Sequence, residues 1–109
     1  MFGRQVTLKL KTNSATELNR IAEAEVLPIL RKQKGFLDET TFIAPERLEA
    51  IANSFWDTKA DAEAYDRTAY AEVLKTLSNV IDGTPTVKTF EFATSTFHKT
   101  GVAAAGKLA

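Results

Sequence analysis

The only tryptophan of the chain, Trp56, stands beside three small residues and is the first candidate for a ligand site. Residues 48–56 read LEAIANSFW, and successive side chains of a strand project to opposite faces. Ala50, Ala52 and Ser54 therefore share a face with Trp56, and a hollow is expected beside the ring. An indole offers a large apolar body and one hydrogen-bond donor, which suits a small-molecule pocket. The alternative is that the ring only fills the protein interior.

Two tyrosines follow the tryptophan at positions that could bring a hydroxyl to the same hollow. Tyr65 and Tyr70 lie in the amphipathic stretch after residue 57. A phenolic hydroxyl both donates and accepts hydrogen bonds, so either tyrosine could orient a substrate at the pocket mouth. Aromatic residues at helical spacing also commonly fill a core, and we expect only one of the two to reach the pocket.

Few residues could act as a general base. His98 is the only histidine, and its side chain has an unperturbed pKa near neutrality, but it falls at or beyond the end of the last expected strand. Glu91 is expected in mid-strand and could serve as a base if burial raised its pKa. The simpler reading pairs Glu91 with a cation such as Lys9. Asp38 and Glu39 read as solvated surface residues.

The composition excludes several classes of function. Fourteen basic and fourteen acidic residues cancel over 109 positions, so no footprint for nucleic acid or an anionic membrane is present. The chain has no cysteine and one histidine, and it lacks nucleotide-binding glycine motifs. We therefore expect no metal, flavin or haem. No stretch reads as a signal peptide or a membrane span, which predicts a soluble, cytoplasmic protein.

Periodicity predicts six elements in the order strand, helix, strand, strand, helix, strand. The expected ranges are strand 2–11, helix 15–34, strand 36–44, strand 48–56, a helix from about 58 to 82 and strand 87–97. Pro28 should kink or break the first helix near residues 24–27. Gly83 and Pro85 should end the second helix. The domain is expected to cover residues 1–98, with residues 99–109 as a flexible tail.

This order is that of the ferredoxin-like fold, an α+β arrangement in which a four-stranded antiparallel sheet carries both helices on one face. In the first strand, Phe2, Val6, Leu8 and Leu10 share the expected core face, and Arg4 interrupts their run. The opposite sheet face is expected to lack a helical cover. The residues assigned to it are Trp56, Ala50, Ala52, Val87 and Ala93 from the later strands, and Gln5, Thr7 and Lys9 from the first. Such an apolar face should be covered by a second copy of the chain.

Three segments resemble the antibiotic biosynthesis monooxygenase family over roughly residues 2–98. They are residues 31–36 (RKQKGF), residues 54–58 (SFWDT), and residues 62–65 (AEAY) together with Tyr70. The resemblance implies a homodimer in which two sheets pack face to face as a dimeric α+β barrel. The family includes cofactor-free oxygenases of phenolic or quinol substrates, haem-degrading enzymes and members without known activity.

This chain departs from the family at several functional positions. Ala52 stands where the antibiotic-forming oxygenases carry an asparagine four residues before the tryptophan. The haem-degrading branch uses a strand-1 asparagine and a helix-2 histidine, whereas this chain has Gln5 and Thr7 in the first strand and no histidine in the second helix.

We therefore predict a homodimer that binds a small, largely apolar, aromatic molecule, with cofactor-independent oxygenation left open. The alternative is a non-enzymatic interaction module whose barrel is fully packed. The residues predicted to contact the ligand are Trp56, Tyr65, Tyr70, Ser54, Ala52, Gln5 and Thr7.

Overall fold

The computed structural model describes residues 1–96, and His98 and the expected tail at 99–109 lie outside them. The elements are β1 (Phe2–Leu10), α1 (Ala15–Ile21), the π-helical turn η1 (Ala22–Val26), α2 (Leu27–Arg31), β2 (Phe36–Ile43), β3 (Glu49–Trp56), α3 (Lys59–Thr68), α4 (Tyr70–Leu77) and β4 (Ile81–Glu91). None of the described helices is long and apolar enough to cross a membrane.

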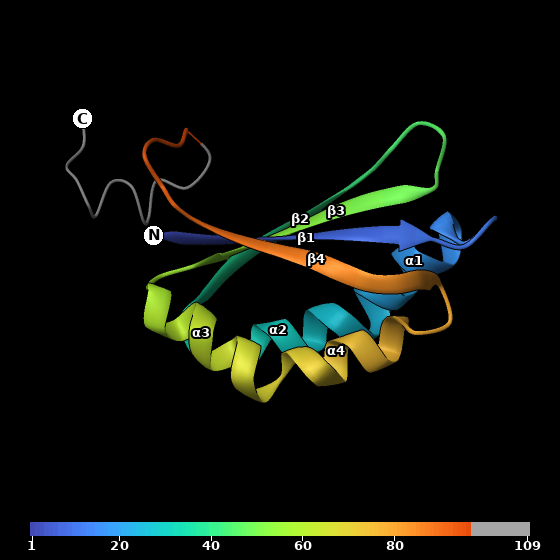
Figure 1. Ribbon diagram of the computed structural model, residues 1–109. Helices are drawn as coiled ribbons and strands as arrows, with labels where there is room; N and C mark the ends of the chain where they lie inside the picture. The colour runs from blue at the N-terminus through green and yellow to red at the C-terminus, as the bar shows by residue number, and fades with distance from the viewer. Residues whose placement is uncertain (97–109) are drawn as a thin grey trace.

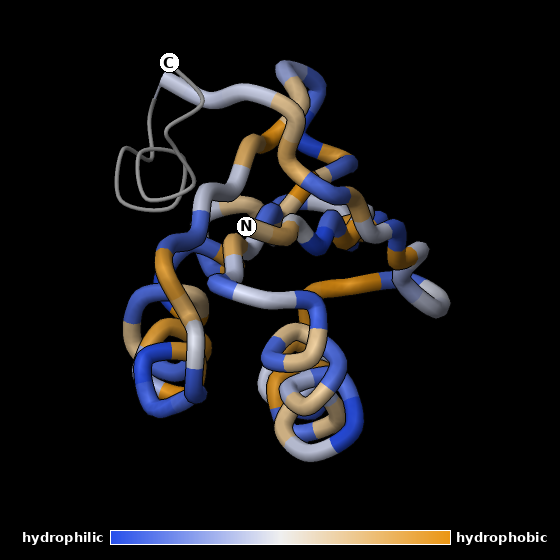
Figure 2. Tube along the Cα trace, turned by 90° about the vertical axis from the view of Figure 1, so that its left-hand side faces the viewer, coloured by the Kyte–Doolittle hydropathy of each residue, from blue (hydrophilic) through white to orange (hydrophobic). Residues whose placement is uncertain are grey.

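The four strands form one antiparallel sheet in the order β2-β3-β1-β4, and the helices cover one of its faces (Figure 1). Seen along the strands, the helices form two arms that lie side by side below the sheet (Figure 2). We call α1, η1 and α2 the first arm, and α3 and α4 the second. The α+β, ferredoxin-like prediction is confirmed.

The first arm changes its helical form where a break was expected. A π-helical turn, in which backbone hydrogen bonds reach one residue further, occupies Ala22–Val26. Pro28 follows this turn directly as the second residue of α2, and its missing N–H falls where the wider π-helical bonds give way to α-helical ones. The arm ends at Arg31 and not at Lys34.

The second arm begins as predicted and ends early. The Thr58 side chain accepts a hydrogen bond of 3.1 Å from the backbone N–H of Asp61, which caps α3. The arm breaks at Ala69 and ends at Leu77, so the prediction of one helix to residue 82 was wrong. Val80 and Ile81 are buried, and they belong to the turn and the strand that follow.

The last strand lies about six residues earlier than the expected range of 87–97. Gly83 and Pro85 do not end a helix; they sit inside β4, at a bulge where the register with β1 shifts between Thr7 and Lys9. Gly83 has a φ of 71°, which glycine adopts without strain. Because β4 is an edge strand and the bulge is irregular, a proline without an N–H is tolerated there.

The predicted assignment of Trp56 to the uncovered sheet face was wrong. Trp56 lies opposite Phe2 in the β1–β3 ladder, and Ala50 lies opposite Leu8. Directly paired residues of antiparallel strands project to the same side, so this row faces the helices. Val87, opposite Val6, also faces the helices, and Ala93 follows the end of β4. Alternation separates the two faces of a strand but does not say which one is covered.

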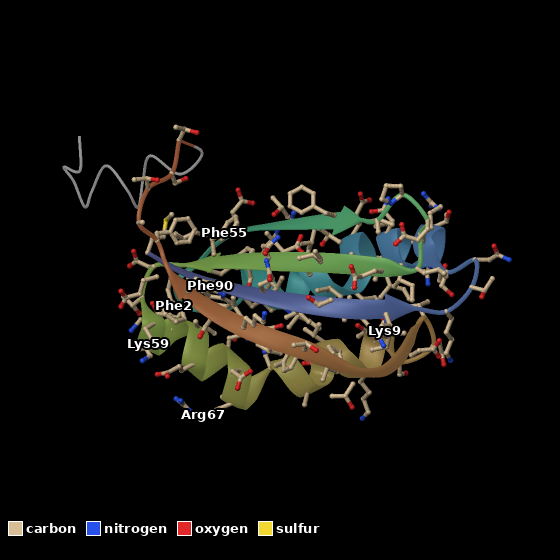
Figure 3. The ribbon with its side chains drawn as sticks, turned by 45° about the horizontal axis from the view of Figure 1, so that its top comes forward. Phe2, Lys9, Phe55, Lys59, Arg67 and Phe90 are labelled. Carbon is tan, nitrogen blue, oxygen red and sulfur yellow. The ribbon has the colours of Figure 1, made fainter. Side chains whose placement is uncertain are left out.

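The uncovered face carries different apolar residues. Phe55 and Phe90 lie on either side of Gly3 (Figure 3). The rings of Phe55 and Phe92 pack edge to face with centroids 5.4 Å apart. Phe42, paired with Ile51 on the neighbouring strands, is 63% exposed, and Phe90 is 51% exposed. This face is still apolar. Trp56, Ala50, Ala52 and Val87, which were assigned to it from the sequence, lie on the other face, whereas Gln5, Thr7 and Lys9 of β1 do lie on it.

Candidate functional site

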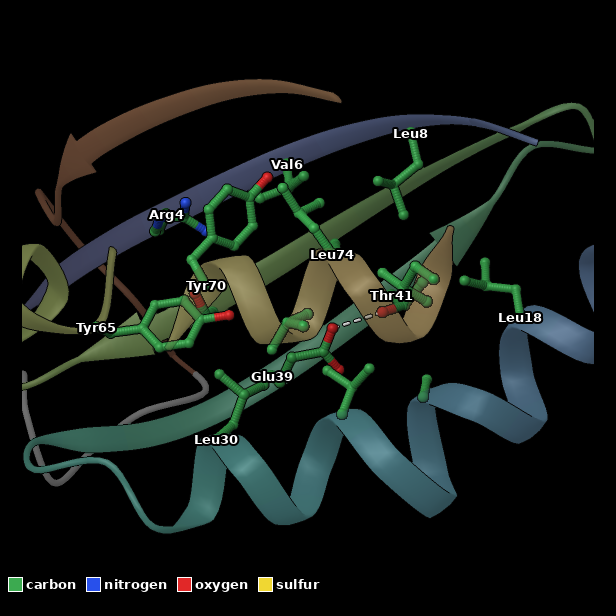
Figure 4. A pocket seen from close by; sticks show the side chains of 16 residues that line it. Arg4, Val6, Leu8, Leu18, Leu30, Glu39, Thr41, Tyr65, Tyr70 and Leu74 are labelled. Carbon is green, nitrogen blue, oxygen red and sulfur yellow. Dashed lines mark hydrogen bonds between the residues drawn. The ribbon is translucent and has the colours of Figure 1, made fainter. Parts of the chain in front are cut away.

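A pocket lies between the sheet and the two helical arms (Figure 4). Its volume is about 60 Å³, and most of its lining is apolar. The apolar walls come from Val6, Leu8, Leu18, Ala22, Val26, Leu30, Ala52, Val73, Leu74 and Leu77. The lining residues that are partly exposed come mainly from η1, β2 and α4, so solvent reaches the pocket on that side.

Arg4 places a buried positive charge at one end of this pocket. It occupies the helix-facing row of β1 and is only 3% exposed. Its Nη2 donates a hydrogen bond of 2.6 Å to Oδ1 of Asp66 on α3, and its guanidinium lies 3.9 Å from the ring centroid of Tyr70. A cation over an aromatic face is attracted by the ring electrons. The sequence held a signal for this residue, because Arg4 interrupts the apolar row of the first strand.

Both predicted tyrosines line the pocket. Tyr65 is 4% exposed, and burial raises its pKa far above the ordinary value. Burial also raises the pKa of Tyr70, while the charge of Arg4 opposes that shift. The Tyr70 hydroxyl is buried and has no hydrogen-bond partner among the described residues. At neutral pH both groups are therefore phenols, and the Tyr70 hydroxyl can bond a ligand.

Glu39 is the functional candidate that sequence reasoning missed. It lines the pocket beside Thr41, whose hydroxyl donates a hydrogen bond of 2.5 Å to Oε2 of Glu39. Loss of hydration raises the pKa of Glu39 above 4.5, and the neighbouring Asp38 adds to the rise, while the Thr41 bond opposes it. A register irregularity between Phe36 and Asp38 places Glu39, and not Asp38, on the face that Phe36 shares. Simple alternation cannot reveal this.

Trp56 lies behind the pocket lining. It is fully buried, its ring stacks on Tyr65 with centroids 5.0 Å apart, and its edge meets Phe36. The indole N–H donates a hydrogen bond of 2.9 Å to Oγ of Ser54. Ser54 and Ala52 do line the pocket. The indole thus supports Tyr65 and Ser54 from behind.

The remaining predicted site residues are not brought together with these. Gln5 and Thr7 project from the uncovered sheet face, where Nε2 of Gln5 donates a hydrogen bond of 3.2 Å to Oδ1 of Asn53. Glu91 is the last residue of β4, exposed and opposite Phe2, so the expected mid-strand position was wrong. Lys9 lies at the other end of the ladder, opposite Asp82, and cannot pair with Glu91. His98 falls outside the described residues.

The arrangement suits hydrogen bonding and proton transfer more than metal chemistry. In residues 1–96, no group of three or more His, Cys, Asp or Glu side chains is placed to hold a metal ion. The pocket instead joins one cation, one carboxyl group and two phenols within apolar walls. Such a set can orient an aromatic ring and control the protonation of a hydroxyl group on it.

Solved structures resemble this chain closely in fold and weakly in sequence. A monooxygenase from the gene ActVA-Orf6 of Streptomyces coelicolor, solved with the ligand nanaomycin D, superposes with a TM-score of 0.74 at 18% identity, covering 86% of this chain and 88% of that one. A structure described as an antibiotic biosynthesis monooxygenase gives 0.68 at 11% identity, covering 86% of this chain and all of the other. The chain has the fold of the antibiotic biosynthesis monooxygenases.

This antibiotic-monooxygenase-like fold also occurs in Rv0793 from Mycobacterium tuberculosis, with a TM-score of 0.67, 8% identity, and coverage of 87% of this chain and 97% of that one. No family model matches the sequence, and no curated protein matches it. Identities this low establish the fold, as the sequence resemblance predicted, and the function has to be argued from the pocket.

Proposed function

We propose that this protein binds a small hydroxylated aromatic molecule in the pocket between the sheet and the helical arms. The observation that carries the proposal is the pocket lining, in which Arg4, Glu39, Tyr65 and Tyr70 stand among apolar walls. The apolar walls favour a ring, and the four polar groups favour hydroxyl substituents. This replaces the predicted ligand site on the open sheet face with one inside each subunit.

A ligand of this kind requires the arms to separate. The pocket volume is about 60 Å³, whereas a cavity that holds benzene has a volume of about 150 Å³. The partly exposed walls come mainly from η1, β2 and α4, and η1 and α4 belong to different arms. A ligand that binds the open form better than the closed one would shift the population toward it.

We further propose oxygenation of this ligand by molecular oxygen without a cofactor. A quinol can supply both electrons itself once it is ionised, so the protein needs to bind it away from water and help to remove a proton. The monooxygenase with bound nanaomycin D supports the proposal by its shared fold. Glu39 supports the proposal by placing a carboxyl group, which can accept a proton, in the pocket lining. The competing reading is a dimeric interaction module with a closed, unused pocket, which the small volume favours.

We also propose that two copies pair through the uncovered sheet face. Phe42, Ile51, Phe55 and Phe90 lie on that face, and the described helices cover only the other. Burying such residues against a second copy is favourable by roughly 25 cal/mol for each Å² of apolar surface. The dimer would leave the pocket entrance free, because the entrance lies on the helical side.

Oxygen uptake and thermal shift with a panel of phenols and quinols test the proposal. Wild type should be stabilised by the ligands that bind, and quinols should drive oxygen uptake. Ala52→Leu fills the pocket from the sheet and should abolish both effects, whereas Ala71→Leu, on the exposed side of α4, should leave them unchanged. If ligands stabilise the protein but no oxygen is consumed, the binding proposal stands and the oxygenation proposal is contradicted. An absence of stabilisation by any ligand favours the interaction module.

A further inference from the structure

The carboxyl group of Glu39 is placed where it can contact a ligand in the pocket. Its register partner on β3 is Ser54, so its side chain leaves the sheet on the helical side and enters the pocket (Figure 4). The Thr41 hydroxyl donates to Oε2. A carboxylate oxygen accepts more than one hydrogen bond, and Oε1 has no donor within residues 1–96.

No cation in the described chain neutralises this carboxyl group. Arg4, the cation that lines the same pocket, pairs with Asp66 instead. Arg31 of α2 lines a neighbouring surface hollow together with Glu39 but forms no ion pair with it. A partly buried carboxylate without a counter-ion is costly, and such costs are concentrated at functional sites.

The other charged and titratable groups around Glu39 affect its pKa or offer hydrogen-bond donors and positive charge to a ligand. Asp38, its neighbour on β2, raises the pKa of Glu39 through its negative charge. Tyr65 of α3 and Tyr70 of α4 share the pocket, and burial keeps both protonated, so they act as donors. Arg4 of β1 supplies positive charge at the far end. The pocket residues from the first arm and from β3 are not titratable.

We propose that the Glu39 carboxylate accepts the hydrogen bond of a ligand hydroxyl group and, during turnover, takes its proton. The O–H bond of the ligand breaks, a new O–H bond forms on Glu39, and the ligand becomes an anion in the pocket that holds the Arg4 guanidinium. The inference rests on the proposed ligand site and narrows the ligand class. Phenols and enols with an ionisable hydroxyl group gain this hydrogen bond. Their methyl ethers bind through the ring alone, and aromatic carboxylates are repelled by the negative charge of Glu39.

Binding of 4-nitrophenol and its methyl ether, 4-nitroanisole, across a pH series tests this role by calorimetry. For wild type, the affinity for the phenol should rise with pH as Glu39 ionises and fall again as the free phenol ionises. A hydrogen bond to a charged group contributes about 1.5–3 kcal/mol, so Glu39→Gln should weaken phenol binding by roughly tenfold to a hundredfold. It should also abolish the acidic limb and leave the ether unaffected.

Two further variants keep the test decisive. Thr41→Val removes the donor that favours the carboxylate, so the acidic limb should move to higher pH even if Glu39→Gln folds poorly. Glu23→Gln, an exposed carboxyl group on η1, should behave as wild type. Unchanged phenol affinity and an unchanged acidic limb in a folded Glu39→Gln variant would overturn the inference while the proposed function stands. A wild type that binds neither probe would overturn both.

Discussion

The indole N–H of Trp56 bonds to the hydroxyl group of Ser54, two residues earlier on the same face of β3, over 2.9 Å. This bond satisfies the one polar atom of a fully buried ring. Because the Ser54 oxygen accepts that bond, its own proton remains free to turn toward the pocket, which Ser54 lines. The pair therefore joins the core to the pocket wall.

Replacing either partner should cost stability by a different mechanism. Trp56→Ala leaves a cavity beneath Tyr65 and should lower the free energy of unfolding by about 3–5 kcal/mol. Ser54→Ala leaves the buried indole N–H without a partner and should cost about 1–3 kcal/mol. Chemical denaturation measures both losses. Equal stability of Ser54→Ala and wild type would show that this hydrogen bond contributes nothing to the free energy of unfolding.

Two glycines with the same backbone conformation should respond unequally to alanine. Gly35 and Gly83 have φ angles of 79° and 71°, so alanine at either position is strained by roughly 1–2 kcal/mol. A Cβ at Gly35 would also collide with the side chain of Asp61, whereas nothing lies within 4 Å of one at Gly83. Gly35→Ala should therefore lose about 1–3 kcal/mol more than Gly83→Ala in denaturant unfolding. Equal losses would mean that Asp61 moves aside freely.

The ionisation of Glu39 should make stability depend on pH. Its pKa is raised in the folded state, so the folded protein holds this proton more tightly than the unfolded chain does. The stabilisation is complete below the ordinary value of 4.5 and is lost as pH rises through the raised pKa. Glu39→Gln should lose less stability than wild type over that interval, as thermal melts can show. Parallel curves for the two proteins would contradict the raised pKa.

Charge on the uncovered sheet face should prevent pairing of two copies. Phe42→Lys and Phe90→Lys alter side chains that are 63% and 51% exposed, so each subunit should still fold. In a face-to-face dimer these lysines would be buried without partners, and light scattering at micromolar concentration should report a monomer. Leu48→Lys, 49% exposed and outside the strands, is the matched control and should remain a dimer. A wild type that is already monomeric would refute the pairing.

The purified protein is predicted to contain no metal, flavin or haem. Elemental analysis for metals and the visible absorption spectrum test this prediction. Stoichiometric metal, or a flavin or haem band, in the purified protein would contradict the expectation. The prediction rests on the absence of cysteine and the single histidine of the sequence.

Local pattern determined the fold class and the order of the strands and helices. Alternation in β1 and β3, the Thr58 cap and the proline at position 28 act over a few residues, so they can be read directly along the chain. Ala52, Ser54 and the two tyrosines, which were predicted as ligand contacts from their residue types, line the pocket.

Only the tertiary structure decided which sheet face the helices cover, and with it where the pocket lies. The two faces of a strand are equivalent until pairing and helix packing distinguish them, so Trp56 was placed on the wrong face. The same packing buries the positive charge of Arg4, a residue that in the sequence only interrupts the apolar row of the first strand. A register irregularity before Glu39 carried its carboxyl group into the pocket. Such long-range pairings depend on residues far apart in the chain, and no local period records them.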